Sequence, residues 1–513
     1  MTEPPRTPAD AQSPFDLIRH WAQTDHPFAS YELPDGSRLD VSYAEQLDRS
    51  MRTAGVLAKN GVSTGDRVHV HLPNGPQFLD VWCGADAIGA IIVPTNPLAS
   101  SGELEHFLGD SGAVVSVVAD DLVDVVRAAL PDDVVLISSS ELESARPTTS
   151  PAEPVAQDRS ALAAILYTSG TTSLPKGVMV TNANYLAVGR ACAEHYRVTQ
   201  EDRWLIVLPF FHGNAQYYCT MSALVAGASI AVMSSFSASN WGRQAREYGA
   251  TLASLFGAPI RMILAQPEND DDADNALRTV MFAQGVSSSQ YADFERRFGT
   301  MLIHGYGMTE TVIPPTLNPL SDDRRPDSMG NALPGMRLRI VGEDGTDVAP
   351  GEPGDLLVYG EMGEGIAAGY WQRPDATAET FAGNWLHTGD VVRLDPDGFY
   401  YFVDRSKDMI KRAGENVAAA EVEAVINEHP AVFESAAVGA PDEMRDEMIV
   451  VYVVLNSGAQ FDADDLTAWS RERLSKFRVP SRFIEADELP RTSVGKIRKN
   501  VLRDELRGDS TSS

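Results

Sequence analysis

Patterns typical of helices and strands alternate along the chain from Tyr43 to Met233, and this alternation constrains the fold most. Residues 43–62 (YAEQLDRSMRTAGVLAKNGV) repeat apolar side chains at helical spacing, and residues 66–73 (DRVHVHLP) alternate as a strand does. The first block of alternating helices and strands continues at residues 77–97 and 103–120. A second block has the same alternation, at residues 161–170, 184–196, 203–212 and 221–233. Strands that alternate with helices predict a layered α/β architecture with largely parallel sheets. We expect the two blocks to form two related α/β sheet subdomains.

The pattern changes near Gly330 to short strands separated by Gly and Pro, at residues 336–341, 354–360, 385–394 and 399–405. The turn signal DPDG joins the last two strands, which predicts a small β subdomain. Beyond it, helices and strands mix as in a compact α+β domain of about 100 residues. We therefore expect a large N-terminal domain at residues 1–404 and a small C-terminal domain at residues 405–513. Residues 1–14 and 508–513 are expected to be disordered tails.

Charge and composition exclude several classes of partner. The net charge of −30 disfavours binding to nucleic acid and to anionic lipid. No apolar run approaches the roughly 18 to 20 residues of a membrane span, and the N-terminal residues lack the pattern of a secretory signal. Three isolated cysteines, Cys83, Cys192 and Cys219, argue against disulfides and a zinc site. We expect a cytoplasmic protein.

A Gly-rich segment, YTSGTTSLPKG at residues 167–177, directly follows an apolar strand. Small hydroxyl residues and glycines permit a tight loop whose N–H groups and hydroxyls face outward, as a polyphosphate requires. Lys176 adds a point charge for the distal phosphates. The spacing GxxxxGKS/T of a Walker A loop is absent. We predict a polyphosphate-binding loop, and a plain surface loop of small polar residues is the alternative.

A second strand-to-turn segment, MLIHGYGMTET at residues 301–311, offers three further groups. Tyr306 offers an aromatic face for a purine, Thr309 a hydroxyl for a phosphate, and Glu310 an oxygen ligand of the kind that Mg²⁺ prefers. The alternative is a strand–turn–helix junction in which the Thr and Glu cap a helix.

Three more polar residues follow in order along the chain. Asp390 stands at a strand end in WLHTGDVV, where a carboxylate accepts two hydrogen bonds from ribose hydroxyls. Arg405 in DRSKDMIKRAGEN is a candidate ligand for ribose or phosphate. Lys496 lies in PRTSVGKIRK, a segment that taken alone is typical of a solvated basic tail.

Together and in this order, the segments resemble the acyl-adenylate-forming superfamily of acyl-CoA synthetases, peptide-synthetase adenylation domains and firefly luciferase. The resemblance extends from GAIIVPTNPLASSGEL at residues 89–104 to LPRTSVGKIRK at residues 489–499. It implies a phosphate loop that moves over the β and γ phosphates and is formed by Thr168, Ser169, Gly170, Thr171, Thr172 and Lys176.

The resemblance also implies roles for single residues. Tyr306 matches the position that stacks on adenine, and Gly285 and Gly307 join it as nucleotide-binding residues. Thr309 matches the α-phosphate ligand, and Glu310, with Thr168, the Mg²⁺ ligands. Asp390 matches the ribose-binding aspartate and Arg405 the arginine after it.

The remaining roles concern the second half-reaction and the movement between the half-reactions. Lys496 matches the catalytic lysine that contacts the carboxylate and the α phosphate during adenylation. Lys407 matches the hinge about which the small domain rotates, and Gly414 lies in the segment that lines the pantetheine tunnel after rotation. His212 matches an aromatic or histidine gate between the acid pocket and that tunnel.

Two residues depart from the usual pattern of the superfamily. Ser173 replaces the glycine after SGTT, and Asp404 replaces the glycine before the arginine. With DRSKDMIKRAGENV, these departures look closest to the carnitine/crotonobetaine CoA ligase branch. Neither of them removes a catalytic group.

The resemblance implies ATP-dependent activation of a small acid as acyl-AMP, with release of pyrophosphate and transfer to coenzyme A, and with ATP, Mg²⁺ and coenzyme A as cofactors. One alternative keeps adenylation but loads a carrier protein, or activates nitrite for attack by an amine. Another is a nucleotide-binding regulator without turnover, which Glu310 and Lys496 disfavour. A homodimer is left open.

The acid itself is expected to bind among four segments. These are residues 209–218 (PFFHGNAQYY), 256–259 (FGAP), 282–286 (FAQGV) and 304–307 (HGYG). Phe211, Tyr217 and Tyr218 suggest an aromatic lining, although aromatic residues near a strand end are more often ordinary core.

Overall fold

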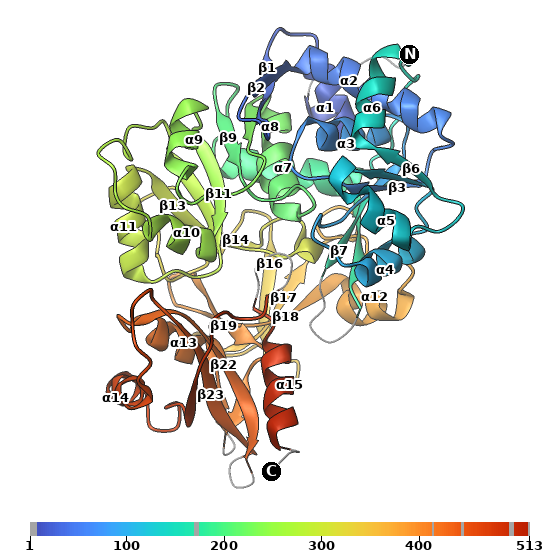
Figure 1. The fold of residues 1–513 in the computed structure, drawn as a ribbon. Coiled ribbons are helices and arrows are strands. Elements are labelled where there is room, and N and C mark those ends of the chain that lie inside the picture. Colours follow the sequence, from blue (N-terminus) through green and yellow to red (C-terminus); the bar gives the residue numbers. More distant parts are fainter. Residues whose placement is uncertain (1–7, 169–173, 413–414, 443–445, 492–496, 511–513) are drawn as a thin grey trace. The chain divides into compact units, whose positions relative to one another are not determined.

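The computed structural model describes residues 8–168, 174–412, 415–442, 446–491 and 497–510. The chain divides into two compact units (Figure 1). The first comprises the described parts of residues 1–168, 175–337 and 358–386, and the second those of 169–174, 338–357 and 387–513. The domain boundary expected at residues 404 and 405 stays a prediction.

A six-stranded sheet in the first unit carries the start of the Gly-rich segment. Its strands in spatial order are β6 (Val135–Ser138), β5 (Val115–Val118), β3 (Arg67–His71), β4 (Ile91–Pro94), β7 (Leu162–Thr168) and β8 (Lys176–Thr181). All neighbouring pairs are parallel except the last, β7 with β8. The helices of this block are α2 (Tyr43–Lys59), α3 (Pro76–Ala87), α4 (Ser101–Ser111), α5 (Val123–Ala129) and α6 (Ser139–Ala145). The expected parallel α/β block is confirmed.

A nine-stranded sheet in the same unit carries the second strand-to-turn segment. Its order is β15 (Asn331–Ala332), β14 (Thr316–Leu317), β13 (Met301–Tyr306), β12 (Thr279–Ala283), β11 (Leu252–Phe256), β9 (Arg203–Ile206), β10 (Ser229–Val232), β1 (Pro27–Glu32) and β2 (Arg38–Ser42). The six strands from β13 to β1 are parallel, and the outer strands are antiparallel. Its helices are α1 (Pro14–Trp21), α7 (Asn182–His195), α8 (Met221–Ala226), α9 (Trp241–Glu247), α10 (Gly257–Leu264) and α11 (Ser288–Phe298).

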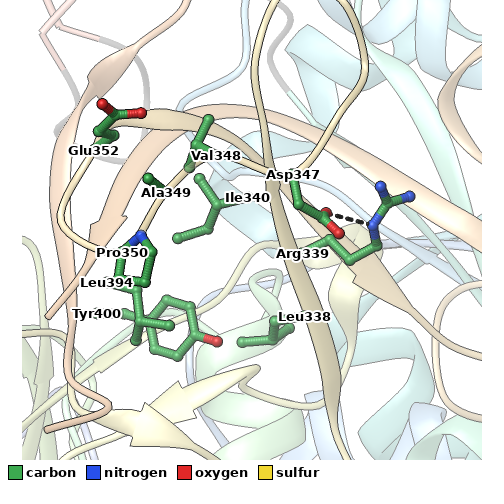
Figure 2. A pocket seen from close by; sticks show the side chains of 10 residues that line it. All are labelled: Leu338, Arg339, Ile340, Asp347, Val348, Ala349, Pro350, Glu352, Leu394 and Tyr400. Carbon is green, nitrogen blue, oxygen red and sulfur yellow. Dashed lines mark hydrogen bonds and ion pairs between the residues drawn. The ribbon is translucent and has the colours of Figure 1, made fainter. Parts of the chain in front are cut away.

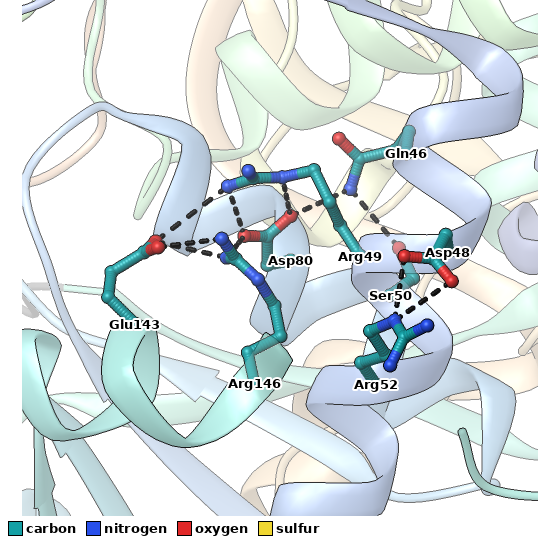
Figure 3. A network of polar contacts seen from close by, with 8 residues as sticks. All are labelled: Gln46, Asp48, Arg49, Ser50, Arg52, Asp80, Glu143 and Arg146. Atoms are coloured by element: carbon teal, nitrogen blue, oxygen red, sulfur yellow. Dashed lines mark hydrogen bonds and ion pairs between the residues drawn. The ribbon is translucent and has the colours of Figure 1, made fainter. Parts of the chain in front are cut away.

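Buried charges tie the helices of the N-terminal block together (Figure 3). Asp80 on α3 is fully buried and forms ion pairs with Arg49 on α2 at 2.6 Å and with Arg146 at 2.5 Å. Arg146 also pairs with Glu143 on α6 at 2.6 Å. Since a buried carboxylate is costly unless it is paired, the two arginines make the position of Asp80 tolerable and fix three helices to one another.

Short strands form the sheet that the Gly- and Pro-rich stretch predicted. Its order is β16 (Arg337–Val341), β17 (Gly354–Tyr359), β18 (Trp385–Leu394) and β19 (Tyr400–Arg405), and helix α12 (Pro374–Thr380) precedes β18. β18 and β19 pair as the expected hairpin. A pocket of about 180 Å³ lies against this sheet (Figure 2), between apolar residues such as Ile340, Pro350 and Tyr400. Because none of the predicted site residues lines it, this pocket is not a candidate active site.

The C-terminal part of the second unit is the expected α+β fold. Its strands are β20 (Ile410–Arg412), β21 (Glu415–Val417), β22 (Val432–Asp442), β23 (Asp446–Leu455) and β24 (Arg482–Glu485), and its helices are α13 (Ala419–Asn427), α14 (Ala463–Arg473) and α15 (Lys499–Ser510). Alternate residues of β23 enter two different cores: Val451 and Val453 pack with α13 and α14, and Val450 and Tyr452 with α15. In Figure 1, α15 lies beside β22.

Residues 8–14 and 508–510, which were expected to be disordered, have regular structure. Pro8–Asp10 form a 3₁₀ helix, Ala11 and Ser13 are fully buried, and the Ser13 side chain caps α1. At the other end, α15 continues to Ser510. Both expectations were therefore too broad, because polar residues in caps and amphipathic helices share the composition of disordered tails.

Candidate active site

The Gly-rich segment begins and ends on two paired strands. Thr168 at the end of β7 lies opposite Lys176 at the start of β8, and the Thr168 hydroxyl lies 3.5 Å from the Lys176 carbonyl oxygen. Ser169, Gly170, Thr171 and Thr172 lie outside the described residues. The antiparallel pairing holds the two ends of the segment side by side, as a loop that folds around a ligand requires.

Helix α4 braces both ends of this loop. The capping box of Ser100 and Glu103 starts the helix, and the left-handed Gly112 ends it. From α4, Asp110 accepts a hydrogen bond of 2.7 Å from the Tyr167 hydroxyl, before the loop. A ring nitrogen of His106 lies 2.8 Å from the carbonyl oxygen of Pro175, after the loop. These braces are not readable from the sequence, because they join residues that are 57 and 69 positions apart.

Asp110 is itself fixed by residues from a third part of the chain. Arg373 pairs with its carboxylate at 2.5 Å, and the Trp371 indole donates to its carbonyl oxygen at 3.1 Å. Burial, together with the hydrogen bond to Asp110, raises the pKa of Tyr167. Tyr167 therefore stays protonated and keeps its role as a donor.

The second strand-to-turn segment folds into a tight turn after β13. Thr309–Thr311 form a 3₁₀ turn, in which the Thr311 hydroxyl donates to the Met308 carbonyl oxygen at 2.9 Å and accepts from the Met308 N–H at 3.1 Å. The next residue, Val312, is buried with φ +58°, in the left-handed region that β-branched residues avoid. Strained backbone of this kind collects at functional sites. Tyr306 and Thr309 are half-buried here, and Glu310 is 5% exposed.

Tyr370 contacts the predicted residues of both segments. Its hydroxyl donates a hydrogen bond of 2.9 Å to a carboxylate oxygen of Glu310. The Lys176 ammonium lies 4.9 Å from the centre of its ring. Lys176 begins β8 of one sheet and Glu310 follows β13 of the other, so the fold brings both residues into contact with Tyr370. Their assignment to a polyphosphate site stays a prediction.

The four segments expected around the acid meet at the carboxyl ends of neighbouring strands. A Cβ added at Gly257, after β11, would lie 2.9 Å from the Gly285 carbonyl oxygen, after β12. A Cβ added at Gly307, after β13, would lie 2.6 Å from the Tyr218 hydroxyl. Both glycines are thus needed for close approach. The carboxyl ends of parallel strands are the usual ligand-binding edge of an α/β sheet.

Tyr217 and Tyr218 lie on η4 (Asn214–Thr220), a π-helix that the sequence did not reveal. Asn214 accepts a hydrogen bond of 2.9 Å from Ser254 of β11, which attaches the π-helix to the sheet. Burial, neighbouring tyrosines and the charge of Glu310 raise the pKa of Tyr217. π-Helical turns inside helices are frequent at functional sites.

His212 precedes the π-helix in a turn. Its N–H donates to the Pro209 carbonyl oxygen at 3.1 Å, and its ring lies 4.5 Å from the ring of Phe211. His212 is half-buried at the start of the segment that carries the two tyrosines. Its role as a gate stays a prediction.

Asp390 and Arg405 form a pair within the second unit. They lie opposite each other on β18 and β19, and the Arg405 side chain contacts the Asp390 carboxylate at 2.9 Å. The Asp390 N–H also donates to the Thr388 hydroxyl at 3.2 Å. Asp390 is 2% exposed, so the arginine offsets the cost of burying its charge. Asp390 and Arg405, which were predicted separately, therefore lie together on one hairpin.

Asp404, which stands where the superfamily has glycine, is also structural. Its carboxylate accepts hydrogen bonds from the N–H groups of Arg405 at 2.7 Å and of Ala420, at the start of α13, at 3.2 Å. Burial raises its pKa, and the nearby Lys499 opposes that shift. Lys407 is exposed, and Gly414 and Lys496 lie outside the described residues.

The structure describes no cluster of three or more His, Cys, Asp or Glu side chains that could hold a metal ion by itself, in the ranges given above. None of the described helices is long and apolar enough to cross a membrane.

Comparisons with known proteins agree with this geometry. A family model described as AMP-binding enzyme matches residues 19–371, and one described as AMP-binding enzyme C-terminal domain matches residues 421–496. The chain is 35% identical to the crotonobetaine/carnitine–CoA ligase of Citrobacter koseri over 492 residues, which cover 92% of this chain and 95% of that protein.

Solved structures of similar proteins extend the agreement to the fold. ATP-bound MatB from Rhodopseudomonas palustris superposes with a TM-score of 0.88 at 27% identity, covering 97% of this chain and 99% of that one. A benzoate CoA ligase from Burkholderia xenovorans LB400 superposes with a TM-score of 0.87 at 25% identity, covering 96% and 99%. The protein therefore belongs to the AMP-binding enzyme family, the acyl-adenylate-forming superfamily that its motifs resemble, and its relatives include the expected crotonobetaine/carnitine–CoA ligase branch.

Proposed function

We propose that the protein activates a small carboxylic acid with ATP, releases pyrophosphate, and transfers the acyl group from acyl-AMP to the thiol of coenzyme A. The observation that carries the proposal is the meeting of Lys176 and Glu310 at Tyr370. A cation on a Gly-rich loop and a buried carboxylate serve a polyphosphate only when they lie together.

Adenylation brings two anions into contact, because a carboxylate oxygen attacks the α phosphorus of ATP. Lys176 offsets the charge of the departing phosphates from the stem of the loop. We assign the face of the adenine to Tyr306, the last residue of β13, and the α phosphate to Thr309, in the turn that follows. Asp390, oriented by Arg405, is the assigned acceptor for the ribose hydroxyls.

The residues present fit a magnesium ion that arrives with the nucleotide. Mg²⁺ is usually bound by one or two carboxylates together with substrate phosphates, rather than by a cage of protein ligands. Glu310 is a buried carboxylate fixed by a hydrogen bond, and Thr168 adds a hydroxyl oxygen at the start of the loop. When bound there, Mg²⁺ neutralises charge on the phosphates.

Lys496 is proposed as the cation that contacts both the acid and the α phosphate during adenylation. The proposed role of Lys407 is that of a hinge, about which residues 405–513 rotate between the half-reactions. In the rotated state Gly414 is proposed to lie beside the pantetheine arm of coenzyme A. His212 is proposed as the gate between the acid pocket and the tunnel that the thiol enters. A cytoplasmic location and a homodimer stay predictions.

Release of pyrophosphate tests the proposal directly. The protein is incubated with ATP and Mg²⁺ and with panels of small aliphatic acids, aryl acids, trimethylammonium acids such as crotonobetaine, and nitrite, with and without coenzyme A. We expect acid-dependent release of pyrophosphate, and equal amounts of AMP and acyl-CoA when coenzyme A is present. Glu310→Gln is the control that should remove both products. Turnover of nitrite with an arylamine, and none with coenzyme A, would refute the proposal.

A further inference from the structure

Residues 367–371 run between the two motif-bearing sheets of the first unit. On one side they extend the edge of β8: the Met179 N–H donates to the Gly369 carbonyl oxygen at 2.9 Å, and the Trp371 N–H to that of Gly177 at 2.7 Å. On the other side the Ala367 N–H donates to the carbonyl oxygen of Glu310 at 3.0 Å. This segment, which we name the bridging segment, thus ties the end of the loop to the turn after β13.

Tyr370 is the residue of the bridging segment that reaches both motifs. Its hydroxyl donates to Glu310 at 2.9 Å in a buried environment, where a hydrogen bond to a charged acceptor is stronger than in water. Because the Tyr370 ring is packed in place, its hydroxyl donates from a fixed direction and contributes to the orientation of the Glu310 carboxylate.

The ring of Tyr370 has a separate contact. The Lys176 ammonium lies 4.9 Å from its centre, within the distance at which a cation is attracted to the face of an aromatic ring. The hydroxyl and the ring face therefore act on two different residues, and the two contacts are separable by substitution.

The surroundings hold Tyr370 itself in place. Its N–H donates to the Thr377 hydroxyl of α12 at 2.9 Å, and its ring packs edge-on against Phe381 at 5.8 Å. Gly369 has φ +108°, and a Cβ there would lie 2.5 Å from a methyl of Thr377. The turn that presents Tyr370 therefore requires glycine on both conformational and steric grounds.

We propose that Tyr370 is a positioning residue for the polyphosphate site: its hydroxyl orients Glu310 for the metal-bound nucleotide, and its ring holds Lys176 beside it. This role rests on the proposed function, in which Glu310 binds Mg²⁺ and Lys176 binds the distal phosphates of ATP. Tyr370 itself acts through these two residues.

Two variants separate the contacts. Tyr370→Phe removes the bond to Glu310 and keeps the ring, and Tyr370→Leu removes both. Calorimetric titration of ATP with and without Mg²⁺, and displacement of Mn²⁺ followed by electron paramagnetic resonance, report on the site without turnover. Tyr370→Phe should weaken Mg²⁺-dependent ATP binding about 10-fold, the usual effect of one hydrogen bond to a charged group, and leave metal-free binding unchanged.

Tyr370→Leu should in addition weaken metal-free binding by about 2- to 5-fold, because Lys176 loses the ring face. Tyr401→Phe is the matched control, since its hydroxyl also donates to a carboxylate, that of Asp395 at 3.0 Å, but outside the proposed site. It should leave both affinities as they are in the wild type. The phenylalanine variant keeps the packing against Phe381, so it is expected to fold.

Double variants decide whether Tyr370 acts through its partners. In a Glu310→Gln background, Tyr370→Phe should have no further effect on metal dependence, and in a Lys176→Ala background, Tyr370→Leu should lose its effect on metal-free binding. Unchanged metal dependence in Tyr370→Phe, or full additivity with Glu310→Gln, would overturn the positioning role alone. Failure of the wild-type protein to bind ATP would instead overturn the proposed function.

Discussion

Replacement of Asp86 by Asn should make the protein more stable above neutral pH. Asp86 lies near the end of α3, is 4% exposed, and accepts a hydrogen bond of 2.7 Å from the Phe15 N–H at the start of α1. The Ser13 side chain also bonds to it, and Asp16 lies close enough to repel its charge. The carboxylate therefore joins two helices while buried with only partial compensation for its charge.

The magnitude follows from the pKa of Asp86, which burial raises from 3.8 to about 7. A difference of about 3 in pKa corresponds to about 4 kcal/mol at 1.36 kcal/mol per pH unit. Between these two pH values the folded chain binds the proton and the unfolded chain releases it, so the stability from this group falls as pH rises. The contribution of Asp86 to the free energy of unfolding is fully present below about pH 4 and is lost by about pH 7. The Asp86→Asn variant has no proton to release at this position, so its free energy of unfolding should not fall for this reason.

Urea titrations at pH 5, 6, 7 and 8 measure the effect as the difference in the free energy of unfolding between Asp86→Asn and the wild type. This difference cancels the other titrating groups. It should grow in favour of the variant as pH rises, towards a limit of about 4 kcal/mol at pH 8. A constant difference for Asp86→Asn, or a variant less stable than wild type at pH 8, would refute the reasoning.

Four further outcomes are expected. Lys496→Ala should lower the rate of adenylation, measured as pyrophosphate exchange, by about 100-fold or more, and the thioester half-reaction much less, whereas equal losses would contradict its assignment. Gly307→Ala should lower kcat/KM about 10-fold because the new methyl displaces the Tyr218 hydroxyl, and Tyr218→Phe in that background should restore part of the loss. Asp80→Ala should lower the unfolding free energy by about 3 to 5 kcal/mol in urea titrations, because the buried Arg146 and the partly buried Arg49 lose their ion pairs with Asp80. Burial lowers the pKa of His71 from 6.5 to about 4, so between these pH values the unfolded chain binds a proton that the folded chain does not, and acid destabilises the fold. In thermal scans, His71→Asn should therefore lose less melting temperature than the wild type between pH 7 and pH 5.

Much of the architecture could be predicted because it depends on local patterns. Apolar periodicity located helices and strands between residues 43 and 233, and Gly and Pro located the hairpin of β18 and β19, whereas β1, β2, β11, β12 and the helices α9 to α11 were not located. The π-helix at Asn214–Thr220 could not be predicted in this way, since its residues have the spacing of an ordinary helix, and hydrogen bonding in the folded chain decides its type. Residues 8–14 and 508–510 were wrongly expected to be disordered, because polar residues in caps and amphipathic helices share the composition of disordered tails.

The residues of the candidate site likewise fall into a group that could be predicted from the sequence and a group that could not. Residues on recognisable loops, such as Lys176, Glu310 and Asp390, were predicted from the chemistry of their side chains and from family resemblance. The residues that hold those loops were not. Asp110, His106 and Tyr370 each lie in an ordinary helix or turn, and only contacts across 57 to 69 positions of sequence reveal what they do.

This division has a physical cause. A group that touches a substrate must be of a certain chemical type, so its identity is visible in the sequence. A group that orients another residue needs only the correct distance and direction, and many residue types in many places provide these. The bridging segment illustrates the point: its glycine and tyrosine look ordinary in sequence, yet they join the edge of one sheet to a turn of the other. If Tyr370 orients Glu310 as we propose, the metal dependence of this enzyme is set by a residue outside every motif that identified it.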